Sequence, residues 1–62
     1  MTNFMDIVMQ KGSDIINFMF VFGIEANMDV WEYRPKKFGE RKLVSDFDSR
    51  YHELLEAGYA EV

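Results

Sequence analysis

The fold of this chain depends on what covers one apolar run, Asp14-Ile15-Ile16-Asn17-Phe18-Met19-Phe20-Val21-Phe22-Gly23-Ile24. Eight of its eleven residues are large and apolar, and three of those are Phe. As a strand, the run is apolar on both faces, which is typical of a strand covered on both sides. As a helix, it has an N-cap at Ser13 or Asp14 and a stop at Gly23. The flanking signals favour a helix and the Phe and Val content favours a strand, so we predict a helix over 14–24 with a strand as the alternative.

The residues before this run predict a second, shorter helix over 2–11. Asn3 can cap it, and Asp6 follows three residues later, as in a capping box. An apolar stripe runs along it, formed by Phe4, Met5, Val8 and Met9. Gly12 is a typical residue at the end of a helix. Lys11-Gly12-Ser13 is therefore predicted to link two helices.

The second half of the chain predicts a β-hairpin and then a helix. Residues 28–34 and 41–44 are rich in strand formers, and Pro35 and Gly39 lie in the loop between them. The last helix is predicted over 47–57, with a cap at Ser45 and a stop at Gly58. Its apolar face has helical spacing and consists of Phe47, Tyr51, Leu54 and Leu55.

These elements predict a small α+β domain spanning residues 1–62, with a mostly helical dimer as the alternative. A chain of 62 residues buries only about 60% of its unfolded surface, so packing alone stabilises it weakly. It has no Cys and one His, which excludes disulfides and leads us to expect no metal and no cofactor. We therefore expect a homo-oligomer whose interface lies in the apolar run and uses Ile16, Asn17, Phe18, Phe20 and Phe22.

The charges are divided along the chain. Residues 1–33 carry one base and five acids, residues 34–42 five bases and one acid, and residues 43–62 one base and five acids. The basic stretch overlaps aromatic residues, a combination that suits an anionic partner. The predicted partner-binding residues are Trp31, Tyr33, Arg34, Lys36, Lys37, Phe38, Arg41 and Lys42. Lysines that guard an exposed sheet edge from aggregation are the simpler explanation of the same pattern.

The function predicted from these features is that of a small acidic interaction protein, not an enzyme. It would regulate or inhibit a partner protein by covering its surface, as small phage or mobile-element proteins do. His52 lacks the second His of a zinc helix, and Asp46 and Asp48 are explained by capping. Nucleic-acid binding by the hairpin 31–42 is the alternative, which a pI near 4.7 disfavours. The apolar run is too short to span a membrane, and a chain without Cys is compatible with the cytoplasm.

Overall fold

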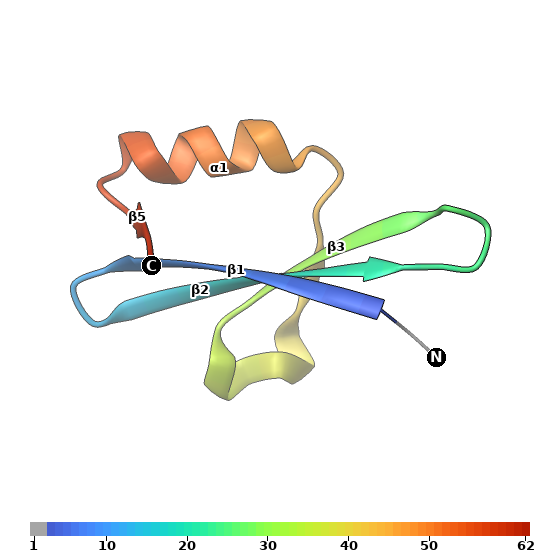
Figure 1. Ribbon diagram of the computed structural model, residues 1–62. Coiled ribbons are helices and arrows are strands. Elements are labelled where there is room, and N and C mark those ends of the chain that lie inside the picture. The colour runs from blue at the N-terminus through green and yellow to red at the C-terminus, as the bar shows by residue number, and fades with distance from the viewer. Residues whose placement is uncertain (1–2) are drawn as a thin grey trace.

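The chain forms one antiparallel sheet that has an α-helix on one face and a 3₁₀ segment on the other (Figure 1). The computed structural model describes residues 3–62. The strand order is β4-β3-β2-β1-β5, so β2 lies at the centre. The elements are β1 Asn3–Lys11, β2 Asp14–Phe22, β3 Met28–Tyr33, η1 Pro35–Glu40, β4 Lys42–Leu43, α1 Phe47–Glu56 and β5 Ala60–Glu61.

The helices predicted over 2–11 and 14–24 are wrong, because residues 3–11 and 14–22 are strands. Residues 23–24 belong to the turn after β2, and residue 2 lies outside the described part of the chain. β1 and β2 pair over their whole length, from Asn3 opposite Phe22 to Lys11 opposite Asp14. Gly12 and Ser13 form the two-residue turn, with Gly12 at a φ of 58°. A Gly with positive φ at the first central position is typical of a type II′ hairpin turn.

The strand alternative for the apolar run is the one that the structure contains, and α1 covers one face of it. Alternate residues of β2 point to α1, and they form the buried core with neighbours on β1, β3 and the helix: Met9, Ile16, Phe18, Phe20, Val30 and Leu54. The ring of Phe47 packs edge-on against Phe18 and Phe20, at centroid distances of 5.1 and 4.9 Å. The fold is thus mainly sheet with one helix in the described residues, which also corrects the alternative of a mostly helical dimer.

The hairpin and the last helix lie where the sequence predicts them. β3 and β4 pair at Trp31–Leu43 and Glu32–Lys42. Asp46, one residue after the predicted cap, accepts the Ser49 N–H at 3.2 Å. At the other end, the Tyr59 N–H donates to the Leu54 carbonyl at 2.9 Å, and Gly58 has a φ of 100°, as in a Schellman motif.

Candidate interaction surface

Three aromatic rings and one arginine gather on the sheet face opposite α1. Val30 of β3 belongs to the core under α1. Successive side chains of a strand point to opposite faces of the sheet, so those of Trp31 and Tyr33 point to the face opposite α1. The ring of Phe38, from η1, packs edge-on against Tyr33 at a centroid distance of 4.9 Å. The guanidinium carbon of Arg41 lies 5.3 Å from the centre of the Trp31 ring and 4.7 Å from that of Phe38. We call Trp31, Tyr33, Phe38 and Arg41 the aromatic–arginine cluster.

Two tight turns in η1 bring Phe38 and Arg41 back over the strand. Pro35 begins the segment with a fixed φ, and the Lys37 N–H donates to the Arg34 carbonyl at 2.7 Å. The Arg41 N–H then donates to the Phe38 carbonyl at 3.1 Å. The predicted hairpin loop is therefore an ordered 3₁₀ segment whose backbone fixes the positions of both side chains.

The buried side-chain amide of Asn17 holds Tyr33 in place. The side-chain amide of Asn17 donates to the Tyr33 hydroxyl at 2.9 Å and to a carboxylate oxygen of Asp6 at 3.4 Å. Burial, with a contribution from the Asp6 charge, raises the pKa of Tyr33 above its usual value, so the hydroxyl stays neutral. Asn17 is 9% exposed and its side-chain amide is hydrogen-bonded within its own chain. It therefore does not require a hydrogen-bond partner from a second copy.

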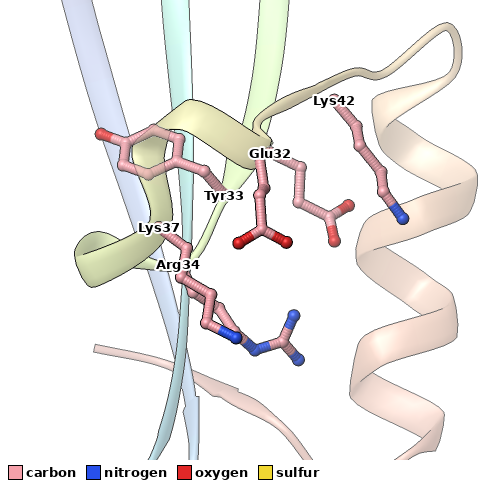
Figure 2. Close-up of a pocket in the computed structure, with 6 residues that line it drawn as sticks. Glu32, Tyr33, Arg34, Lys37 and Lys42 are labelled. Atoms are coloured by element: carbon pink, nitrogen blue, oxygen red, sulfur yellow. The ribbon is translucent and has the colours of Figure 1, made fainter.

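The basic side chains do not form one patch. Arg34, Lys37 and Lys42 line a surface hollow of about 290 Å³ together with Glu32, Tyr33 and Glu40. Figure 2 shows Tyr33 and Lys42 on opposite sides of this hollow, with Lys42 extending toward α1 and Tyr33 away from it. Lys36 lines a neighbouring hollow beside Ser13 and Ile15 of the β1–β2 turn. The eight predicted partner-binding residues thus divide into the aromatic–arginine cluster and four bases that line two separate hollows.

Arg34 anchors this region to the central strand. Its guanidinium binds the Asp14 carboxylate through two bonds, Nε to Oδ1 at 2.8 Å and Nη2 to Oδ2 at 3.0 Å. The Tyr59 hydroxyl donates to the same carboxylate. The hydrogen bond from Arg34, followed by that from Tyr59, lowers the pKa of Asp14 to about 2. One carboxylate therefore joins β2, the start of η1 and the residue that precedes β5.

We expect Asp14→Asn to remove a pH-dependent part of the stability. The folded pKa of Asp14 is about 2, below the ordinary 3.8, so its contribution is complete above pH 3.8 and is lost as the pH falls toward 2. Urea midpoints measured from pH 7 to pH 2 should therefore differ most between the wild type and Asp14→Asn at neutral pH and converge near pH 2. Glu25→Gln is the control for loss of one carboxylate elsewhere. Parallel curves for the wild type and Asp14→Asn would contradict the role of this carboxylate.

The residues predicted to form an oligomer interface lie mainly inside the single chain. Ile16, Phe18 and Phe20 are buried under α1, and Asn17 is buried on the other face. Phe22 is the member that stays exposed, because it lies beyond the start of α1. An interface made of all five would require α1 to leave the sheet. Part of the apolar surface that remains exposed is at the end of the sheet where Phe22 lies.

No cluster of metal ligands is present among the described residues. Within residues 3–62, no three His, Asp or Glu side chains lie close enough to hold an ion. His52 is exposed, and its Nδ1 lies 2.8 Å from the carbonyl of Asp48 one turn earlier. No helix in this part of the chain is long and apolar enough to cross a membrane. Comparison with protein-family models, curated proteins and solved structures gives no match.

Proposed function

We propose that the protein is a non-enzymatic interaction protein, acting in the cytoplasm, that binds a partner protein through the aromatic–arginine cluster and covers its surface. The observation that carries this proposal is the position of the Arg41 guanidinium, stacked on Trp31 and Phe38. Trp, Tyr and Arg are the residue types that most often dominate the energy of protein interfaces. Here they are held in one arrangement before any partner binds, which lowers the entropy cost of binding.

The partner surface should be acidic at its centre. The Arg41 guanidinium lies over both rings, and its Nη1–H donates to the Phe38 carbonyl at 3.4 Å. Its remaining N–H groups can donate to a carboxylate of the partner. Lys36 and Lys37 add charge at the rim, where it would increase the rate of association more than the affinity. A regulator or inhibitor of such a partner needs no cavity of its own, because covering a surface is sufficient.

The same stacking disfavours nucleic-acid binding, the alternative function. Proteins that bind single strands use exposed aromatic faces on which bases stack. Arg41 occupies faces of Trp31 and Phe38, and Tyr33 is packed against Phe38 and bonded to Asn17. A base would have to displace the arginine first. A carboxylate-bearing protein surface can use the cluster as it stands.

We expect Arg41→Gln to weaken partner binding at least tenfold and Lys42→Gln to change it less than about threefold. The two variants are a matched pair, because each removes one positive charge and the residues are adjacent in sequence. Arg41 belongs to the cluster, whereas Lys42 extends toward α1 (Figure 2). Tagged wild type and variants would be used to capture proteins from extracts of the native cells, with quantification by mass spectrometry.

Treatment of the extract with nuclease separates the two candidate functions. A protein retained by the wild type and Lys42→Gln, lost from Arg41→Gln, and unaffected by nuclease would support the proposal. Equal capture by all three proteins would reject the cluster as the binding site. Loss of all captured material after nuclease treatment would replace the proposal with the nucleic-acid alternative.

A further inference from the structure

Both edge strands of the sheet are two residues long, and the longer uncovered stretch lies on β1. At one edge, β4 is two residues long, carries Lys42 and is followed by a chain that leaves the sheet. Short edge strands and edge lysines are common means of preventing pairing with another chain. At the other edge, β5 pairs only with Met9 and Gln10 of β1, and the Val62 N–H donates to the Val8 carbonyl. Among the described residues, no strand lies beside the outer edge of β1 over residues 3–7.

The hydrogen bond from Val62 to Val8 shows which backbone groups of β1 point to this open edge. The carbonyl of Val8 points outward because it accepts a bond from the chain beyond β1. Backbone groups of alternate residues in a strand point to the same edge, so the N–H and C=O of Phe4 and Asp6 also point outward. Those of Met5 and Ile7 point to β2. The open edge therefore presents two donors and two acceptors.

Exposed apolar side chains surround the same edge. Phe4 is 64% exposed and Met5 is 49% exposed. On the face that α1 covers further along, Phe22 and Met28 continue the apolar surface past the start of the helix. Figure 1 shows this end of the sheet extending beyond α1. Asp6 is the only charged residue in residues 3–7, and the segment contains no Lys or Pro to prevent pairing.

We propose that a second copy of the chain pairs with this edge, antiparallel, around a two-fold axis at Met5. In that register Phe4 of each copy lies opposite Asp6 of the other, and each pair exchanges both of its outward N–H and C=O groups. All four outward groups of each copy are then bonded. The two five-stranded sheets become one sheet of ten strands with both helices on the same face. This inference is independent of the proposed partner-binding cluster, which lies on β3 and η1.

The features of the edge select a second copy as the occupant. The uncovered segment of β1, residues 3–7, has Met5 at its centre, because β5 covers β1 from Val8 onward. The uncovered segments of two copies therefore have equal length and can pair along it around Met5. The register around Met5 also separates the charges, since Asp6 faces Phe4 of the other copy. Pairing around Asp6 would instead place two carboxylates directly opposite each other, which destabilises a sheet. The exposed Met5 side chains of the two copies would meet at the axis, so the same residue covers itself, as in a two-fold interface.

The register can be tested with a single introduced thiol, because the natural chain contains no Cys. In the proposed register the two Met5 residues form a non-hydrogen-bonded pair of the antiparallel ladder. The Cα atoms of such a pair are about 4.5 Å apart, within the range of about 4.4–6.8 Å that a disulfide requires. Met5→Cys should therefore form a covalent dimer under mild oxidation. Met28→Cys is the matched control, since Met28 is on the same face and 53% exposed. Its Cα would lie more than about 20 Å from that of the second copy, given strands about 4.8 Å apart.

A second experiment tests the backbone pairing without a covalent bond. Sedimentation equilibrium of the wild type should show a mass that rises toward twice the 7.4 kDa of one chain. Phe4→Pro removes one outward donor per copy and should raise the dimer dissociation constant about 10- to 100-fold relative to Phe4→Ala, which loses the ring but keeps the N–H. Circular dichroism would show that both variants remain folded. A wild type that stays at 7.4 kDa at high micromolar concentration, or equal crosslinking of Met5→Cys and Met28→Cys, would overturn the proposal.

Discussion

Leu54→Ala is expected to cost about 2–5 kcal/mol of unfolding free energy, because it leaves a cavity at a packed position. Leu54 is 4% exposed and is the only α1 residue in the buried core. The substitution does not weaken the helix itself, since Ala is the best helix former. A domain of 62 residues has a total stability of only about 3–9 kcal/mol. The variant should therefore be partly or fully unfolded at room temperature.

Leu55→Ala is the matched control for this prediction. Leu55 is the next residue on the same helix and is 41% exposed, so its truncation should cost about 1 kcal/mol or less. Thermal melts followed by circular dichroism would compare the two variants with the wild type. If Leu54→Ala and Leu55→Ala lowered the melting temperature equally, α1 would not pack on the sheet through the face described above.

The difference between these two leucines shows what periodicity alone can predict. The sequence places Leu54 and Leu55 on one apolar stripe with Phe47 and Tyr51, and the helix lies within one residue of its predicted bounds. Its stop at Gly58 is also confirmed, since Gly58 has a positive φ and the Tyr59 N–H donates to the Leu54 carbonyl. Which leucine is buried depends on where the sheet lies below the helix. That position is fixed by contacts with β2, which periodicity in α1 does not contain.

The N-terminal half was predicted wrongly because its signals suit two structures equally well. Gly12 has a positive φ, which both a helix end and a type II′ turn require. Ser13 and Asp14 are good helix caps and also good turn residues. Periodicity cannot distinguish a short buried strand from a short buried helix. The pairing of β1 with β2 along their whole length decides between them, and that pairing is a property of both segments together.

The candidate site was predicted as a list of residues without their grouping. Trp31, Tyr33, Phe38 and Arg41 come together because η1 folds back on β3. The bases Arg34 and Lys42 have other neighbours, Asp14 and the α1 side of the sheet. Asn17 and Asp6, which support Tyr33, and Glu32, which binds the helix, were not identified as part of the site. In the sequence, each of these three residues is a polar residue in a mainly apolar strand. Which group each of them binds depends on residues distant in sequence.

The largest effect expected from a polar substitution is that of Arg50→Ala. Arg50 contacts Glu53 one turn later on the helix, but its main partner is Glu32 of β3. Two parallel bonds of 2.8 Å, from Nε and Nη2, join it to both oxygens of that carboxylate. The Glu32 side chain is 14% exposed. This ion pair therefore ties α1 to the sheet in a region where the charges are partly removed from water.

Arg50→Ala should cost about 2–3 kcal/mol, less than the 3–5 kcal/mol for breaking a fully buried pair, because Arg50 retains some contact with water. Most of that cost comes from the Glu32 carboxylate, which is left without its partner in a partly buried position. Replacing it with a neutral group of the same shape should recover part of the loss. Arg50→Ala combined with Glu32→Gln is therefore expected to be about 1–2 kcal/mol more stable than the sum of the two single changes predicts.

Urea unfolding of the wild type, the two single variants and the double variant gives this coupling directly. Glu53→Ala is the control, since it removes the exposed partner of Arg50 and leaves the bond to Glu32; an exposed i,i+3 pair contributes only about 0.2–0.5 kcal/mol. Additive effects of Arg50→Ala and Glu32→Gln would mean that the two charges do not interact. Because Lys42 is opposite Glu32 in the β3–β4 register, Lys42→Gln removes a positive charge beside the carboxylate and should enlarge the effect of Arg50→Ala.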